Sequence, residues 1–302
     1  MKLQQLEVFV SVVEQGGIRA AARQMQVSQA AVTKSMRLLE EEAGLQLLLR
    51  RARGIALTDA GTRLLARARL VSRQVGIARE EMRQMAGENI GTLRVGVTPF
   101  LTLTSLGPAF RWFRQRYPGV QIQLIEGLMT RVVPRLRDGT LDIAVVAVDV
   151  GEIQDDEFHC RRILQAPQRI VVRAGHPVLA DPNAHDLCAL EWVLTQPIAD
   201  GQQPRIDAMF TMAGVAPPQQ VIVCESMAAL TILRNTDRVS IFPEPLLGHP
   251  ETRDIVAIVD APLWPCDIEL VLLTRPDVPL TPAAEYFAHC LSSVGQAAQP
   301  AG

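Results

Sequence analysis

The sequence predicts an amino-terminal winged helix-turn-helix and a long helix, followed by a larger α/β domain. Three observations lead to this prediction. Two short helices joined by a tight turn, then a basic segment, occupy residues 18–53. An apolar seam, in mostly alternating steps of four and three residues, continues to residue 85. From residue 92 onward, apolar strands alternate with helices, which is the pattern of parallel sheets covered by helices on both faces.

The second helix of the pair has one apolar face and one polar face. Ser28 precedes it, and a serine there can accept an open backbone N–H of the first turn. Val32, Met36 and Leu39 follow each other at i, i+4 and i+7, so we expect them to be buried together. Glu40, Glu41 and Glu42 are expected to form the last turn of this helix, and Gly44 to end it. Side chains on the polar side are of the types that contact base edges and phosphates. These candidate DNA-binding residues are Ser28, Gln29, Ala30, Thr33, Lys34 and Arg37.

Taken alone, such a helix is more often an ordinary surface helix, since polar faces are common. Its neighbours favour DNA binding. A helix with apolar residues from Leu3 to Val13 precedes the pair, and a short basic loop with a strand at residues 55–57 follows as a wing. Arginines in a wing can contact phosphates or enter the minor groove, whereas an isolated charge run is as often a solvated surface. The wing candidates are Arg50, Arg51 and Arg53.

A long helix is predicted from its cap, Thr58, to about Met85. Its apolar seam extends over several heptads, which favours parallel or antiparallel pairing with a second copy of the chain. Packing against the rest of its own chain is the alternative. A dimer would bring two reading helices to half-sites about one turn of DNA apart. The seam consists of Leu57, Leu64, Ala68, Val71, Val75, Ala78, Met82 and Met85.

A series of motifs runs along the chain in a fixed order. It comprises Leu3-x-x-Leu6-x-x-Phe9, Arg19-Ala20-Ala21, Val27-Ser28-Gln29-x-Ala31-Val32-Thr33, Leu39-Glu40, Gly44, Leu47-x-x-Arg50, Leu57-Thr58-x-Ala60-Gly61, Gly139-x-Leu141-Asp142-Ile143-Ala144, His176-Pro177 and Ile241-Phe242-Pro243. With these motifs the chain resembles the LysR-type transcriptional regulators. It departs from that family at Gly17, Ala30 and Leu48, where Ser, Pro and Phe are usual. These departures bear on the individual operator contacts and leave the fold prediction unchanged.

The resemblance implies three parts: a winged helix-turn-helix at residues 1–58, a linker and dimerisation helix with a hinge at 59–90, and an effector-binding domain at 91–302. The last part would resemble a periplasmic solute-binding protein. One subdomain would comprise about 91–164 and 267–302, the other about 165–266, with a cleft between them. The implied assembly is a homodimer through the linker helix that pairs into a homotetramer. The implied partners are double-stranded operator DNA, a small-molecule effector and, as a further candidate, RNA polymerase.

Effector candidates lie where predicted strands end, because ligands of open α/β sheets bind at the carboxyl ends of strands. A threonine there is more often a helix cap than a ligand contact. The shared location of several such residues nevertheless favours a binding site. Apolar side chains beside them favour an organic acid or an aromatic compound over a sugar. The effector-binding candidates are Thr98, Pro99, Phe100, Met129, Thr130, Thr195 and Asp200.

Charge and hydropathy agree with this organisation. Through residue 90 there are 14 Lys and Arg against 9 Asp and Glu, whereas the remainder has 16 against 23. The basic amino-terminal part suits binding to nucleic acid, whereas the acidic remainder does not. With 48% hydrophobic residues the chain can bury a sizeable core. No leader and no apolar run approaching 18 residues is present, so we expect a cytoplasmic protein without a membrane partner.

The common catalytic and cofactor-binding motifs are absent, and the histidines show no metal-ligand spacing. We therefore expect no enzyme, no catalytic residue, no metal and no cofactor. The five cysteines lack C-x-x-C spacing and are expected to be reduced, with a redox-sensing regulator of the same architecture as an alternative. A ligand-binding protein unrelated to transcription would explain the later two thirds of the chain, but not residues 1–90.

Overall fold

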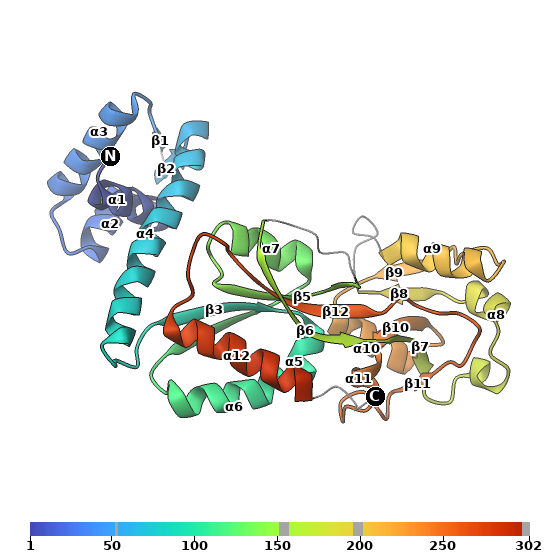
Figure 1. The fold of residues 1–302 in the computed structure, drawn as a ribbon. Helices are drawn as coiled ribbons and strands as arrows, with labels where there is room; N and C mark the ends of the chain where they lie inside the picture. Colours follow the sequence, from blue (N-terminus) through green and yellow to red (C-terminus); the bar gives the residue numbers. More distant parts are fainter. Residues whose placement is uncertain (52–53, 151–156, 196–201, 298–302) are drawn as a thin grey trace. The chain divides into compact units, whose positions relative to one another are not determined.

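The computed structural model describes residues 1–51, 54–150, 157–195 and 202–297 (Figure 1). The chain divides into two compact units, one of residues 1–91 with 138–140 and one of residues 92–137 with 141–302. Within the described residues, none of the helices is both long enough and apolar enough to span a bilayer.

The first unit is a winged helix-turn-helix built on the start of a long helix (Figure 1). Its elements are α1 (Leu3–Glu14), α2 (Ile18–Gln24), α3 (Gln29–Ala43), β1 (Leu48–Arg51), β2 (Gly54–Leu57) and α4 (Asp59–Met85). Phe9, Val12 and Leu39 are among the fully buried side chains at its centre. The turn between α2 and α3 contains Gln26 in the left-handed region, with φ 56°.

The wing is a two-stranded antiparallel ladder. Arg50 pairs with Ile55 and Arg51 with Gly54. Arg50 and Arg51 therefore belong to a strand, and placing them in the loop before the wing was wrong. Antiparallel pairing with β2 includes both residues in the ladder, which the local charge pattern does not indicate.

The long helix α4 begins as predicted. Thr58 caps it by accepting the Gly61 N–H at 2.9 Å, and Leu65 and Ala68 in its first turns are buried in the core of the unit. Farther along, the side chains of Val71, Met82 and Met85 are 44%, 58% and 68% exposed. Much of the later part of the predicted seam is thus exposed to solvent in the single chain.

The second unit contains two five-stranded sheets, ordered β4-β3-β5-β12-β6 and β11-β7-β10-β8-β9. The strands of the first sheet are β3 (Thr92–Val97), β4 (Gln121–Glu126), β5 (Ile143–Asp149), β6 (His159–Ala166) and β12 (Ile268–Thr274). The strands of the second are β7 (Gln168–Arg173), β8 (Trp192–Leu194), β9 (Val221–Val223), β10 (Val239–Pro243) and β11 (Val256–Ile258). The chain passes from the first sheet to the second at Pro167 and returns before β12.

Both sheets are mixed, so the expectation of parallel sheets holds for only some of the strand pairs. β3 runs parallel to β4 and β5, but β12 runs antiparallel to both β5 and β6, and β7 antiparallel to β10. A strand that returns directly from the other sheet needs no crossover helix, so antiparallel pairing is available to it. Repetition of β-α units in the sequence does not indicate the direction of the returning strand.

Helices cover the sheets of the second unit (Figure 1). They are α5 (Pro99–Thr104), α6 (Leu106–Arg116), α7 (Met129–Arg137), α8 (Ala184–Ala189), α9 (Gln202–Met212), α10 (Ser226–Asn235), α11 (Glu244–Leu247) and α12 (Pro282–Ala297), with the 3-10 helix η1 (Pro177–Ala180). The helices α5 and α6 are separated by Ser105. Around the first sheet, Phe113 meets Phe287 edge to face, and around the second Trp192 meets Phe210 in the same way.

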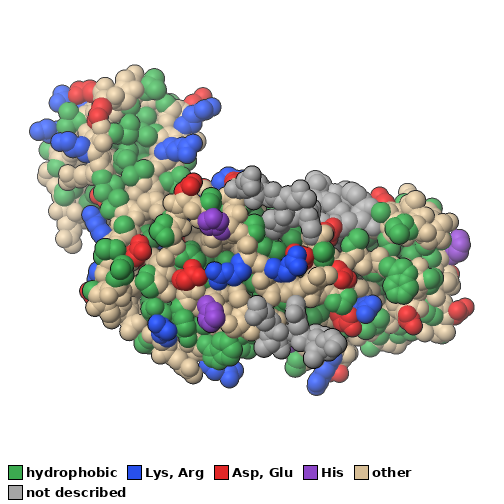
Figure 2. Space-filling view, in the orientation of Figure 1, with side chains coloured by type: hydrophobic (Ala, Val, Ile, Leu, Met, Phe, Trp, Pro, Cys, Tyr) green, Lys and Arg blue, Asp and Glu red, His purple; other side chains and the backbone are tan. Residues whose placement is uncertain are grey.

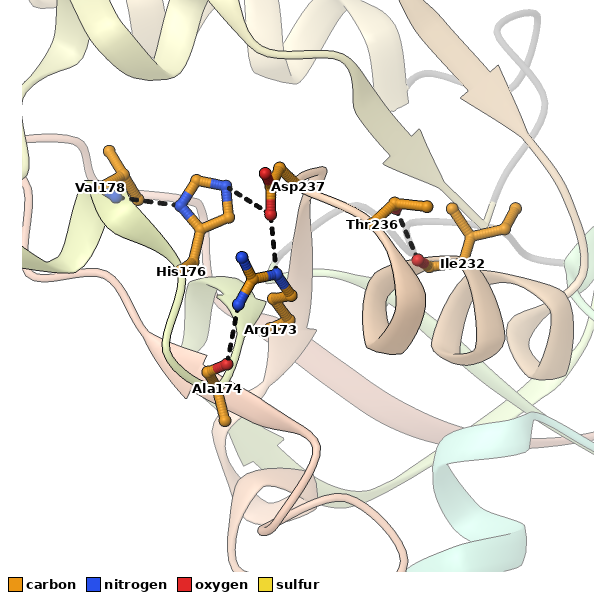
Figure 3. Close-up of polar contacts among 7 residues, drawn as sticks. All are labelled: Arg173, Ala174, His176, Val178, Ile232, Thr236 and Asp237. Atoms are coloured by element: carbon orange, nitrogen blue, oxygen red, sulfur yellow. Dashed lines mark hydrogen bonds and ion pairs between the residues drawn. The ribbon is translucent and has the colours of Figure 1, made fainter.

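His176 begins η1 as a buried cap. Its Nδ1 accepts the Val178 N–H at 3.0 Å (Figure 3). Its Nε2 lies 3.9 Å from Asp237 Oδ1, which also accepts from Arg173 Nε at 2.7 Å (Figure 3). The imidazole therefore satisfies a buried backbone donor at the start of η1.

Replacing His176 by alanine is expected to lower the free energy of unfolding by about 1–3 kcal/mol, because the Val178 N–H would be left buried without an acceptor. Denaturant unfolding followed by circular dichroism measures the loss. Asp237→Asn is the control, since this exposed carboxylate contributes at most about 1 kcal/mol. Equal losses in the two variants would contradict a capping role for the ring.

Candidate DNA interface and ligand cavity

α3 is anchored by its cap, its buried face and its end. Ser28 Oγ accepts the Ala31 N–H at 3.2 Å. Val32, Met36 and Leu39 are all buried. The helix ends at Gly44, whose φ of 65° is favourable for glycine. The predicted cap, apolar face and end of this helix are confirmed.

The other side of α3 faces solvent. Gln29, Ala30, Thr33, Lys34 and Arg37 are all exposed. Thr33 Oγ1 donates to the Gln29 carbonyl oxygen at 2.9 Å, and Arg37 Nε lies 3.5 Å from Glu41 Oε1. The Gln29 amide and the Lys34 ammonium make no hydrogen bond or ion pair with another described residue. These two groups are available to a partner without breaking an existing contact.

Glu40 joins the end of α3 to the wing. Its Oε1 accepts the Leu47 N–H at 2.8 Å and the Leu48 N–H at 3.2 Å. The Leu47 carbonyl oxygen in turn accepts the Thr58 N–H at 3.0 Å. Sequence reasoning assigned Glu40 only to the end of the helix, and a carboxylate shortly before an apolar strand was the available signal. The side chains of Arg50 and Arg51, and the whole of Arg53, lie outside the described residues.

Side chains of both charges are present on the face of the first unit seen in Figure 2, where Lys and Arg lie near its edges. The surface around α3 is thus mixed in charge rather than uniformly basic.

A cavity of about 110 Å³ lies between the two sheets of the second unit. Strand ends and helix starts from both halves form its walls. The lining residues are Thr98, Pro99, Phe100, Leu103, Leu128, Ala147, Gln168, Thr195, Ser226, Leu230, Ile241, Phe242, Pro243, Leu246, Thr252 and Ile268. The cavity therefore occupies the position where two α/β halves meet.

Four of the predicted effector residues line this cavity: Thr98, Pro99, Phe100 and Thr195. At the end of β4 it is Leu128 that lines it, rather than Met129 or Thr130, and both of those side chains are exposed. α7 begins at Met129, so its first side chains follow the helix while Leu128 stays in the loop. Asp200 lies outside the described residues.

The sequence did not predict that residues of β7, β10 and α10 line the cavity. Gln168, Ser226 and Phe242 are examples. The motif Ile241-Phe242-Pro243 was a usable signal, but it had served only as part of the resemblance to the family.

The polar groups of the cavity are few. Thr98 is 3% exposed, and although it precedes α5 its hydroxyl does not cap that helix. The Thr252 hydroxyl donates to the Leu246 carbonyl oxygen. Among the described lining residues none is Lys, Arg, His, Asp or Glu.

The described cysteines and carboxylates form no metal site, and two of the thiols have raised pKa values. Burial, with a smaller effect of Glu225, raises the pKa of the Cys224 thiol, and burial raises the pKa of the Cys290 thiol. A raised pKa keeps a thiol protonated and less reactive. Among the described residues, no cluster of His, Cys, Asp and Glu is placed to hold a metal ion.

Two family models match the chain. The model of the LysR substrate binding domain matches residues 86–296, and that of the lysR family of bacterial regulatory helix-turn-helix proteins matches residues 3–62. The chain belongs to the LysR family of transcriptional regulators. Its first motifs predicted this family.

Relatives and solved structures agree with this assignment. The regulator TdcA of Escherichia coli K12 is 26% identical over 65% of this chain, which spans 62% of TdcA. The SDS degradation transcriptional activation protein of Pseudomonas sp. (strain ATCC 19151) is 29% identical over 94% of this chain and 93% of its own length.

Among solved structures, CbnR complexed with its target DNA superimposes with a TM-score of 0.67 at 23% identity, covering 97% of this chain and all of CbnR. A full-length OxyR variant from Pseudomonas aeruginosa gives 0.66 at 18% identity, covering 98% of this chain and 95% of its own. At these identities the structures show a shared fold.

Proposed function

We propose that this LysR-family regulator reads operator DNA with α3 and the wing, and that a small molecule in the cavity controls it. The observation that supports the first part most is the construction of α3. Its cap and buried face hold the helix in place, while Gln29, Thr33 and Lys34 remain exposed. Specificity would come from Gln29 and Thr33, and affinity from Lys and Arg contacts with phosphates.

The proposed assembly is a homodimer through α4 that pairs into a homotetramer. The exposed side chains of Val71, Met82 and Met85 support pairing, because a second copy would bury them. Two reading helices would then meet two half-sites. RNA polymerase is a further proposed partner if the regulator activates transcription.

The proposed effector occupies the cavity between the two sheets of the second unit. Residues from both halves line it, so a bound ligand would favour the arrangement in which both halves contact it. A single aromatic or short branched molecule suits the walls better than a sugar, because most lining side chains are apolar.

Neither catalysis nor redox sensing is part of the proposal. The described residues offer no metal-holding cluster. The raised thiol pKa values of Cys224 and Cys290 argue against peroxide reactivity at these two cysteines, since the thiolate is the reactive form.

Two substitutions on α3 should separate base reading from phosphate attraction. Gln29→Ala is expected to reduce the preference for operator over scrambled duplex by about 10- to 100-fold, as one base contact is lost. Lys34→Ala should weaken binding to both duplexes and lower the slope of log affinity against log salt by about 1. Fluorescence anisotropy with an operator selected from random duplexes, across a salt series, measures both effects.

Arg111→Ala is the matched control, because this exposed arginine lies in the second unit, away from α3 in sequence. It should bind like the parent. If Gln29→Ala keeps full base preference and Lys34→Ala keeps the parental salt slope, α3 is not the reading helix.

A further inference from the structure

We infer that residues 83–91 form a latch, which folds the segment after α4 back onto that helix and fixes the direction in which the chain leaves the first unit. The sequence indicated only a hinge at this place. The inference rests on the proposed function, because it names the segment through which an effector would act on the reading helices.

The chain reverses at the end of α4 through a backbone motif. The Glu88 N–H donates to the Arg83 carbonyl oxygen and the Gly87 N–H donates to that of Gln84, both at 3.0 Å. Gly87 has φ 90°, in the left-handed region that favours glycine. This pair of hydrogen bonds is the Schellman motif, which ends a helix with a sharp turn. Residues 88–91 are thereby directed back toward α4 (Figure 1).

A buried amide holds the returning segment. Gln84 is 9% exposed, and its Nε2 donates to the Ile90 carbonyl oxygen at 2.9 Å. Glu80 lies one turn earlier on the same face of α4. A Cβ on Gly91 would lie 2.8 Å from Glu80 Oε2 and 2.9 Å from Gln84 Nε2. Residue 91 therefore packs directly against α4, and its φ of 118° also favours glycine.

An ion pair holds the outer side of the turn. Arg83 Nε and Nη2 donate to Glu88 Oε2 at 2.9 and 2.6 Å. The two side chains are 58% and 46% exposed, so their attraction is modest and is screened by salt. Residues 86–89 are all exposed, so apolar burial adds little to the latch. Polar contacts therefore hold it closed.

The strength of these contacts suits a reversible device. One hydrogen bond and one exposed ion pair favour the closed form by a factor of roughly 10 to 100. A ligand whose affinity differs between two arrangements by a comparable factor can shift such an equilibrium. The other end of α4 is held more firmly, because Leu65 and Ala68 are buried in a core. The latch is the end of α4 that opens more easily.

Three substitutions should open the latch by independent routes. Gln84→Met keeps the side-chain length but removes the amide, Glu88→Gln removes the charge, and Gly91→Ala places a Cβ against Gln84 and Glu80. Hydrogen exchange of the Gly87 and Glu88 amides, followed by mass spectrometry in the full chain, should become about three- to tenfold faster in the first and third variants.

Glu88→Gln should accelerate this exchange only about twofold, and about 0.5 M sodium chloride should remove its difference from the parent. Arg79→Ala is the matched control. Arg79 is an exposed arginine one turn before Arg83 and makes no hydrogen bond or ion pair with another described residue. Its exchange should equal that of the parent. Parental exchange in both Gln84→Met and Gly91→Ala would overturn the latch.

A second readout separates control of the reader from local stability. In the proposed homotetramer, loose connectors would let a duplex that spans both reader pairs adopt more than one bend. Fluorescence transfer between dyes at the two ends of a selected operator should therefore show a broader distance distribution with Gln84→Met than with Arg79→Ala. Faster exchange with an unchanged distribution would overturn the role in control. If the parent binds no duplex, the proposed function fails, while the exchange rates still decide whether the latch is closed.

Discussion

Replacing Gly61 by alanine should destabilise the DNA-binding unit by roughly 3 kcal/mol, since overpacking against fixed backbone is costly. A Cβ at this position would overlap the carbonyl oxygen of Leu47 and approach Leu57 Cδ2 to 3.0 Å. Leu47 cannot easily move away. Its carbonyl oxygen accepts the Thr58 N–H at 3.0 Å, and its own N–H donates to Glu40 at 2.8 Å.

Movement of Leu47 would disturb the wing and the end of α3, because Glu40 in α3 accepts the N–H groups of Leu47 and Leu48. We therefore expect operator binding to fall together with stability. Thermal and denaturant unfolding measure the stability, and anisotropy measures the binding.

Gly76→Ala is an internal control in the same helix. A Cβ there meets no atom within 4 Å. Alanine has the higher helix propensity, so this variant should gain about 0.5–1 kcal/mol. If both glycine variants change stability in the same direction, the close contact with Leu47 does not limit the packing of α4.

The double variant Val71→Glu with Met82→Glu should convert the dimer to a monomer and weaken operator binding by about 100-fold or more. Both side chains are exposed in the single chain, at 44% and 58%. The fold of one chain should therefore tolerate glutamate. In a paired seam, however, each glutamate would be buried without a partner, and loss of the second reading helix removes one half-site from the complex.

Analytical ultracentrifugation and operator anisotropy measure these effects. Ala66→Glu is the matched control, because Ala66 is exposed and lies on the side of α4 opposite the seam. A double variant that remains dimeric and binds operator like the parent would show that α4 pairs through another face, or does not pair.

Local signals predicted the first unit well. Ser28, Gly44 and Thr58 mark the ends of helices by cap chemistry and by the left-handed conformation of glycine, and all three act as expected. Such signals work because they depend on residues within about one helical turn of each other. The exposed face of α3 follows from the same periodicity.

Contacts between distant residues were harder to foresee. Arg50 and Arg51 join a strand through partners across a hairpin, and Glu40 binds backbone groups seven and eight residues away. Neither arrangement has a periodic pattern. Met129 and Thr130 were chosen by their place after a strand, whereas the cavity is lined by Leu128 just before them.

The order of residues along the chain was sufficient to establish the helix-turn-helix, the length of α4 and the alternation of strands and helices, because each reflects spacing over a few residues. The direction of β12 and the uncharged lining of the cavity arose from folding. They bring together segments as far apart as Thr98, Gln168 and Phe242. Such encounters depend on how two sheets meet in space, and no local pattern of residues records that meeting.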